Sequence, residues 1–211
     1  MPAPGGRDDE SIAAAIRAVD ITLGILAGGR ATRLGGIDKA WMERGGVPQV
    51  LRWQRRFAHE TGALLVSANR DLPRYAQAGL HAVADRIAGD RGPIAGLDAL
   101  LAGCRTPWLL TLPVDLVGVN DCLLPSLCSA RGENGAFAID DDGPQPLVAL
   151  WRVEAATLAL SQAVERNEAA IHSLHGRLRM TGMRLEGVRF GNLNTPDDLH
   201  AAGVTPESRH D

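Results

Sequence analysis

The sequence predicts an α/β fold in which helices cover both faces of one mostly parallel sheet, giving three layers. Two observations support this prediction. Nearly uninterrupted apolar runs such as Ile21–Ala27 and Trp108–Leu112 are typical of strands buried on both faces. Segments with helical spacing separate these runs, and strands that alternate with helices indicate right-handed, mostly parallel connections.

The expected elements follow along the chain. Strands are expected at 21–27, 63–68, 81–84, 108–112, 136–140 and 147–151, with β-like character over 183–190. Helices are expected at 48–59, 72–78, 93–101, 120–130, 153–166, 168–178 and 196–202. Pro93 lies in a tolerated first turn, and Thr195 is the expected N-cap of the last helix. Trp53 and Phe57 are expected to face the core.

Length and composition limit the domain organisation, the partners and the location that can be expected. With 211 residues, we expect one domain over 21–203, a loosely ordered leader over 1–20 and a polar, frayed tail over 204–211. The net charge of −3 excludes a general attraction to nucleic acid or membranes. The acidic leader does not resemble a secretory signal, and the cysteines form no CxxC pair. We therefore expect a cytoplasmic protein with buried, reduced thiols.

The segment Leu26–Lys39 (LAGGRATRLGGIDK) carries the strongest functional signal. Its four glycines let the backbone approach a ligand closely, and successive backbone N–H groups in such loops cradle phosphates. Arg30, Arg33 and Lys39 add positive charge that would neutralise a triphosphate as pyrophosphate leaves. A tight turn with solvated charges is the alternative, but the combination favours a phosphate site. The motifs GxGxxG and GxxxxGK[ST] are both absent here.

Lys39 stands out for a second reason. The chain has 21 arginines and this single lysine, so arginine supplies nearly all of its positive charge. An ammonium is compact and flexible where a guanidinium is a planar fork, so the exception indicates a functional need. Chance is the alternative, and the position of Lys39 inside the glycine loop favours function.

Polar residues follow three of the predicted strands. The glycine loop follows the first, Asn69 the second and Asp115 the strand at 108–112. Ligands of such sheets bind beyond the carboxyl ends of the strands, so one shared site is expected. Asp115 fits an Mg²⁺ ligand, because Mg²⁺ is often held by one or two carboxylates plus phosphates. A turn or capping aspartate is the alternative.

Two other groups are weaker candidates. Asp140, Asp141 and Asp142 precede Gly143, and a solvated hairpin turn is favoured over a metal cluster. His172 and His175 are three residues apart, but without a third ligand we interpret them as ordinary helix residues.

The glycine loop also supports a resemblance. The pattern LAGG-x3-RLGG-x-DK resembles the signature of molybdenum cofactor guanylyltransferases, within the wider family of MobA-like NTP transferases. The resemblance extends from Ile21 to about Ala202. It includes ANR at 68–70, D-x6-GPIAG at 85–96, LPVD at 112–115, QPLVALW at 145–151 and NLNTPDDL at 192–199.

The resemblance implies a single-domain, Rossmann-like fold of the nucleotide-diphospho-sugar transferase type. It implies transfer of GMP from GTP to the phosphate of molybdopterin, which forms the guanine dinucleotide cofactor and pyrophosphate with Mg²⁺ as the metal. It also implies other cofactor-biosynthesis proteins and apo-molybdoenzymes as partners.

The site residues that the resemblance implies fall into five groups by role. Backbone groups would hold guanine and the first phosphate: Leu26, Ala27, Gly28 and Gly29. Two side chains, Lys39 and Arg33, would bind phosphates and stabilise the transition state. Asn69 and Asp85 would contact the nucleoside, and Asp115 would coordinate Mg²⁺ as the third catalytic group. Asn192 and Asn194 would lie on the acceptor side.

The chain departs from the family pattern at Trp41–Arg44, which is bulkier and more charged than usual and would alter the rim of the site. The leader is also longer. The alternatives are a cytidylyltransferase on the same acceptor and a sugar-phosphate nucleotidyltransferase. A nucleotide-binding regulatory protein without turnover is the alternative of a different class. The presence of both Lys39 and Asp115 argues against it.

Overall fold

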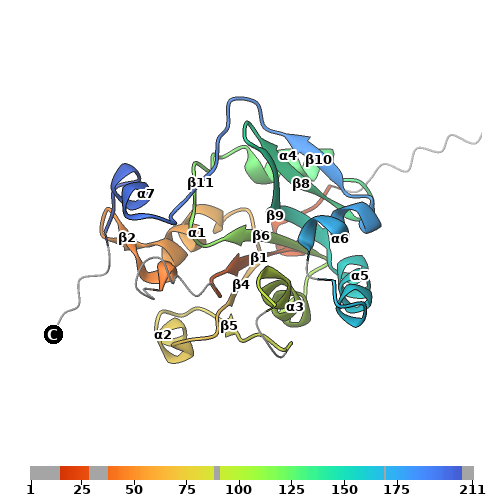
Figure 1. The fold of residues 1–211 in the computed structure, drawn as a ribbon, viewed down its shortest axis with the longest axis horizontal. Helices are drawn as coiled ribbons and strands as arrows, with labels where there is room; N and C mark the ends of the chain where they lie inside the picture. Colours follow the sequence, from red (N-terminus) through yellow and green to blue (C-terminus); the bar gives the residue numbers. More distant parts are fainter. Residues whose placement is uncertain (1–14, 29–37, 88–90, 169, 206–211) are drawn as a thin grey trace, which may run out of the picture.

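The computed structural model describes residues 15–28, 38–87, 91–168 and 170–205. Within them, a seven-stranded sheet has the order β10-β8-β9-β6-β1-β4-β5 (Figure 1). Its strands are β1 (Ile21–Leu26), β4 (Ala63–Ser67), β5 (Ala82–Val83), β6 (Trp108–Pro113), β8 (Gly135–Asp140), β9 (Gly143–Arg152) and β10 (Thr181–Arg184). Neighbouring strands are parallel except at β9, which runs antiparallel to β6 and β8. The predicted α/β fold with a mostly parallel sheet is confirmed.

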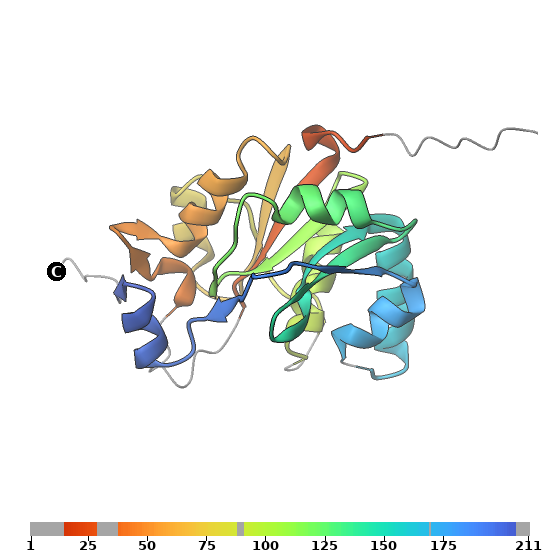
Figure 2. The ribbon, with the colours of Figure 1, turned by 90° about the horizontal axis from the view of Figure 1, so that it is seen from above.

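Helices cover both faces of the sheet. One face carries α1 (Gln49–Phe57), α2 (Leu72–Gln77) and α4 (Leu123–Ala130), and the other carries α3 (Pro93–Gly103), α5 (Val153–Glu165) and α6 (Ile171–Leu178). Figure 2 shows the green α4 on one side of the sheet and the cyan α5 and blue α6 on the other. The predicted three layers are therefore present.

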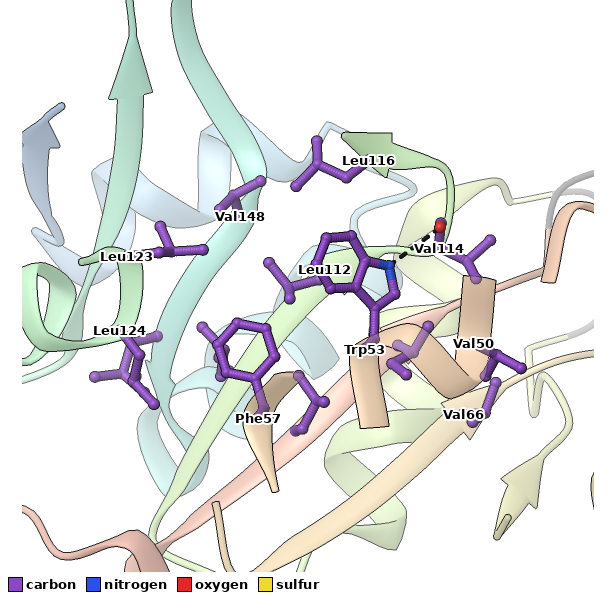
Figure 3. Packing of buried hydrophobic residues seen from close by; sticks show 14 of the residues in the cluster. Val50, Trp53, Phe57, Val66, Leu112, Val114, Leu116, Leu123, Leu124 and Val148 are labelled. Atoms are coloured by element: carbon purple, nitrogen blue, oxygen red, sulfur yellow. Dashed lines mark hydrogen bonds between the residues drawn. The ribbon is translucent and has the colours of Figure 1, made fainter. Parts of the chain in front are cut away.

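The strands alternate between two apolar cores. Along β1, Ile21, Leu23 and Ile25 pack into the core under α1 and α4, while the intervening positions face α3. Trp53 and Phe57 of α1 lie in the first core, as predicted (Figure 3). A strand with both faces covered needs apolar residues at nearly every position, which explains the apolar runs of the sequence.

Short elements extend this framework at one end of the sheet. Three two-residue strands form a small antiparallel sheet: β2 (Glu43–Arg44), β3 (Val47–Pro48) and β12 (Val204–Thr205). Two further two-residue strands pair with each other, β7 (Leu116–Val117) and β11 (Gly191–Asn192). Two 3-10 turns, η1 (Ala18–Asp20) and η3 (Lys39–Trp41), and α7 (Pro196–Ala201) complete the elements described here. Thr195 caps α7 as predicted, with its hydroxyl accepting from Asp198.

Three expectations need correction. The β-like segment 183–190 is a strand only to Arg184, because a turn at Gly187 follows and the Phe190 N–H donates to Asp140 instead of a neighbouring strand. Val204 and Thr205 pair with β2, so they belong to the folded part and not to a frayed tail. All three cysteines are free, but only Cys104 is buried.

Of the helices in the described ranges, none combines the length and the apolar character that crossing a bilayer requires. The division into leader, domain and tail stays a prediction, because residues 1–14 and 206–211 lie outside the described part.

Candidate active site

A cavity of about 400 Å³ opens at the carboxyl ends of β1, β4 and β6. Its walls come from the segments that follow these strands, from the start of α3 and from β9. The lining residues are Leu26, Ala27, Gly28, Lys39, Ser67, Asp85, Gly92, Pro93, Gly96, Pro113, Val114, Asp115 and Leu147. This is the edge of the sheet at which ligands of parallel α/β folds bind.

One end of the cavity is charged. The Lys39 Nζ donates to Asp115 Oδ2 at 2.7 Å and to Asn194 Oδ1 at 2.7 Å. The side chains of Lys39 and Asp115 are only 16% and 18% exposed. The fold thus joins three residues that lie 76 and 155 positions apart in the sequence. We call Lys39, Asp115 and Asn194 the charged end of the cavity.

A buried cluster holds Lys39 in place. Asp38 caps the turn η3, since its Oδ1 accepts from the Ala40 N–H at 2.9 Å, and its Oδ2 accepts from the Tyr75 hydroxyl at 3.3 Å. Burial raises the pKa of Asp38, although these hydrogen bonds act in the opposite direction. Trp41 packs on Tyr75 with 5.0 Å between ring centroids, and the Arg74 guanidinium lies 4.0 Å from the Trp41 ring centroid.

Trp41 is therefore part of the core, being 5% exposed, and Met42 is fully buried. The expectation that this stretch alters the rim of the site is wrong for these two residues. Trp41 packs on Tyr75, and Met42 packs with Leu193, Leu199 and Val204, so both residues have packing roles.

Three hydrogen bonds to the backbone of Val114 and Asp115 fix the turn that carries the Asp115 side chain. The Val114 N–H donates to Leu26 O at 3.0 Å, and the Leu193 N–H donates to Asp115 O at 3.1 Å. The buried indole of Trp53 donates to Val114 O at 3.1 Å (Figure 3). The turn that carries the carboxylate is thus fixed by β1, α1 and the segment before Asn194.

Asn194 is positioned by the cap of α7. The Asp198 Oδ2 accepts from the N–H groups of Asn194 and Thr195 at 3.1 and 2.8 Å. Hydrogen bonds from Thr195 and Asn194 lower the pKa of Asp198. Asn192 is exposed and pairs with Leu116, the residue after Asp115.

A second set of polar groups lies on the other side of β1 in the strand order, at the ends of β4 and β5, whereas Asp115 follows β6. Asn69 Nδ2 donates to Asp85 Oδ2 at 2.7 Å, and the Asp85 N–H donates back to Asn69 Oδ1 at 2.9 Å. The Ala27 N–H donates to Ser67 O at 2.9 Å, which ties the start of the glycine loop to β4. We call Ser67, Asn69 and Asp85 the base end of the cavity, because the family resemblance implies nucleoside contacts for Asn69 and Asp85.

The structure thus brings Leu26, Ala27, Gly28, Lys39, Asp85 and Asp115 to one cavity, with Asn69 and Asn194 bonded to its walls. Two predicted residues, Gly29 and Arg33, lie outside the described residues. Sequence reasoning missed Ser67 and Leu147. Ser67 ends the strand that precedes Asn69, so the strand-end rule that selected Asn69 also points to it. Leu147 lies on the antiparallel β9, inside the QPLVALW pattern of the resemblance, but no spacing rule places that strand against the cavity.

The two weaker candidates lie elsewhere. Asp140 is buried in the β8–β9 turn, where its Oδ1 accepts from the N–H groups of Asp142 and Gly143 at 3.0 and 3.1 Å. The hairpin turn is confirmed, with Asp141 and Asp142 exposed and Asp140 buried. His175 is buried in α6 and stacks on Phe137. Among the described residues, no group of three or more acidic, histidine or cysteine side chains could hold a metal ion.

Comparison with solved structures defines the fold. The fold is similar to that of molybdopterin-guanine dinucleotide biosynthesis protein A from Archaeoglobus fulgidus, with a TM-score of 0.64 and 19% identity over 86% of this chain and 96% of that one. It is also similar to 2-C-methyl-D-erythritol 4-phosphate cytidylyltransferase from Thermus thermophilus, with a TM-score of 0.64 and 16% identity over 85% and 96% of the two chains. The fold is the Rossmann-like fold of nucleotidyltransferases.

Sequence comparison identifies the family. The model of the MobA-like NTP transferase domain matches residues 23–178. A molybdenum cofactor guanylyltransferase of Cupriavidus pinatubonensis is 34% identical over 87% of this chain and 98% of its own length. One of Yersinia pseudotuberculosis is 31% identical over 85% and 93% of the two chains. The chain belongs to the MobA-like NTP transferase family and is a nucleotidyltransferase.

Proposed function

We propose that this enzyme transfers GMP from GTP to the phosphate of molybdopterin, or of its molybdenum-loaded form, and releases pyrophosphate. The observation that carries the proposal is the contact of Lys39 with Asp115 and Asn194 at the wall of a cavity of about 400 Å³. A cavity of this size is within the range that holds small-molecule ligands. The names of the similar relatives support GTP as the nucleotide and molybdopterin as the acceptor.

The nucleotide lies with its phosphates toward the charged end. Lys39 offers an ammonium to phosphate oxygens, and the backbone of Leu26, Ala27, Gly28 and Gly29 contacts guanine and the first phosphate. Asn69 and Asp85 contact the nucleoside at the base end. Opposite charges attract strongly in a partly buried site, which favours this direction of binding over its reverse.

Charge stabilisation and positioning account for the chemistry. The acceptor phosphate attacks the α-phosphorus in line, the bond to the pyrophosphate oxygen breaks, and pyrophosphate leaves. Lys39 and Arg33 stabilise the negative charge that grows on the leaving oxygens. Asn192 and Asn194 orient the acceptor on the side of α7.

Asp115 fits a divalent metal. Its carboxylate lines the cavity, and one or two carboxylates with substrate phosphates are the usual ligand set of Mg²⁺. Membership of a nucleotidyltransferase family is consistent with a divalent metal, and we propose Mg²⁺ in particular. When bound, Mg²⁺ would neutralise charge on the phosphates. Lys39 holds Asp115 Oδ2 and so orients the carboxylate for this role.

We place the reaction in the cytoplasm, where GTP is available and free thiols persist. Other cofactor-biosynthesis proteins and apo-molybdoenzymes are the proposed sources and recipients of the cofactor. The cytidylyltransferase and sugar-phosphate alternatives are supported by fold alone, since such solved structures are distant in sequence.

The test is direct assay of the transfer. Purified protein, molybdopterin, MgCl₂ and GTP labelled at the α-phosphorus should yield a labelled dinucleotide and one pyrophosphate per turnover. The Lys39→Ala variant is the matched control and should form little product. Transfer of label from CTP but not GTP would replace the guanylyl assignment with the cytidylyl one. Binding of GTP without product would favour the regulatory alternative.

A further inference from the structure

Ser67 is a buried polar residue at the end of β4. It is fully buried, and it lines the cavity beside Gly28 and Gly96. Its Oγ has no hydrogen-bond partner among the described residues. The proposed function assigns no role to this hydroxyl.

An unpaired hydroxyl is unusual in this sheet. Leaving a buried polar group without a partner costs free energy, so most such groups are paired. On the neighbouring β1, the buried Thr22 Oγ1 lies 2.7 Å from Thr106 Oγ1. On β6, the buried Thr111 Oγ1 accepts from the Trp151 indole at 2.8 Å. Ser67 differs from both because it faces the cavity.

Two glycines pack close to the Ser67 hydroxyl. A Cβ atom added at Gly96 would lie 2.9 Å from Ser67 Oγ, and one added at Gly28 would lie 3.8 Å from it. A side chain at position 96 would therefore press on the hydroxyl from α3. Only glycine at position 96 lets α3 pack this closely, so no side chain from Gly28 or Gly96 separates Ser67 from the cavity that all three residues line.

A second unpaired atom lies in the same cavity wall. Asp85 Oδ1 is buried and has no partner in the described part of the chain, while Asp85 Oδ2 is held by Asn69. A carboxylate repels phosphates, so this end of the cavity suits the N–H donors of a base. Lys39, and Asp115 through a divalent metal, take the phosphates at the other end.

We propose that the Ser67 hydroxyl hydrogen-bonds to the edge of the guanine base, beside Asp85, and helps to select the nucleotide. Guanine offers the N1–H and the 2-amino group as donors and O6 as an acceptor, and a hydroxyl can pair with either kind. The proposal depends on GTP being the nucleotide, as proposed above. The unpaired Ser67 hydroxyl would then lower the stability of the free protein and raise its affinity for the nucleotide.

The test compares Ser67→Ala with Thr22→Val, which removes a paired buried hydroxyl far from the cavity. Calorimetric titration gives the Kd of GTP and of tripolyphosphate, both with Mg²⁺, and thermal unfolding gives the Tm of each free variant. For Ser67→Ala we expect a Kd for GTP about five- to tenfold higher, an unchanged Kd for tripolyphosphate, and an equal or higher Tm. For Thr22→Val we expect a lower Tm and an unchanged Kd for GTP.

Each other outcome overturns the proposal in a distinct way. If wild-type protein binds GTP and Ser67→Ala binds it equally well, the base contact is wrong while the proposed function stands. An equal loss of affinity for tripolyphosphate would assign Ser67 to the phosphates. A loss that disappears with 2′-deoxy-GTP would assign it to the ribose. If wild-type protein binds another nucleotide but not GTP, the proposed function fails, and the guanine contact fails with it.

Discussion

The two ends of the cavity satisfy their polar groups in opposite ways. At the charged end, Lys39 is bonded to both Asp115 and Asn194. At the base end, Ser67 Oγ and Asp85 Oδ1 are buried with no partner in the described residues. No atom of Lys39, Asp115 or Asn194 is both buried and unpaired in the described residues, whereas the base end has buried hydrogen-bonding groups left over.

This difference follows from the cost of burial. An unpaired buried charge costs far more than an unpaired hydroxyl, so the fold pairs Lys39 with Asp115 before any ligand arrives. Phosphates and a metal must then share or replace these contacts, whereas a base only adds contacts to Ser67 and Asp85. We therefore expect variants at the charged end to affect turnover, and variants at the base end to affect binding.

The largest effect is expected for Asp115→Asn. The amide keeps the shape of the side chain but loses the charge that pairs with Lys39 and holds a divalent metal. We expect kcat to fall by about a hundredfold or more and the dependence on Mg²⁺ to weaken, with an unchanged circular dichroism spectrum. Asp121→Asn, at an exposed carboxylate, is the control and should be fully active. Wild-type activity of Asp115→Asn would make this residue a strand-end aspartate only.

Lys39→Arg should have the next largest effect. The guanidinium keeps the charge, but its planar fork cannot fit between Asp115 and Asn194 as the ammonium does. We expect kcat to fall roughly tenfold or more, about 1.4 kcal/mol of transition-state stabilisation, with a small change in KM for GTP. Arg44→Lys on β2 makes the reverse exchange away from the cavity and should be neutral. Normal kcat in Lys39→Arg would mean that charge alone matters, and normal kcat in Lys39→Ala would remove Lys39 from the catalytic groups.

Asn194→Ala should have a smaller effect, on the acceptor side. The change removes one of the two acceptors of Lys39 Nζ but leaves the ion pair with Asp115. We expect KM for molybdopterin to rise about threefold to tenfold, while the Kd of GTP stays unchanged. Steady-state kinetics and calorimetric titration measure the two quantities. A weakened GTP affinity with unchanged acceptor KM would place Asn194 on the nucleotide side.

The smallest effect on activity is expected at an unpaired buried atom outside the cavity. His175 Nε2 has no partner in the described residues, and burial lowers the pKa of His175 to about 4. Because the folded state favours neutral histidine, its contribution to stability is present above the unfolded pKa of about 6.5 and is lost as the pH falls toward 4. Between pH 7 and pH 5 this amounts to about 2 kcal/mol.

Chemical denaturation of wild-type protein and of His175→Phe, which retains a ring against Phe137, measures this contribution. The variant should lose the decrease between pH 7 and pH 5 while its affinity for GTP at pH 7 stays unchanged. Equal pH dependence of the two proteins would show that His175 is not the titrating group. A change in GTP affinity would contradict the expectation that His175 affects only stability, whereas Ser67 affects nucleotide binding.

The sequence predicts the elements that bury continuous apolar runs. It places β1, β4 and β6 within one or two residues of their observed ends, because both faces of these strands are covered. It does not predict the two-residue strands β2, β3, β7, β11 and β12, since so short a pairing leaves no periodicity. The strand expected up to Phe190 fails because one backbone N–H bonds to a buried carboxylate far along the chain.

The site residues also divide into those that the sequence predicts and those that it does not. The strand-end rule brings the glycine loop, Asn69 and Asp115 to one edge, but no spacing rule joins Lys39 to Asn194, and only the family resemblance pointed to that residue. Ser67 lies at the strand end to which the same rule points, but a serine within an apolar run looks like any other strand residue. Its unpaired hydroxyl is visible only once the packing around Gly28 and Gly96 is known.

The most direct test of the account is a comparison of the four nucleotides by thermal unfolding. Ligands that bind the folded state raise the Tm, so GTP, CTP, ATP and UTP are compared at equal concentration with Mg²⁺. If the base end selects guanine, GTP must raise the Tm more than the other three. Equal shifts for all four, or a larger shift for CTP, would contradict the guanylyl assignment and with it the role given to the base end.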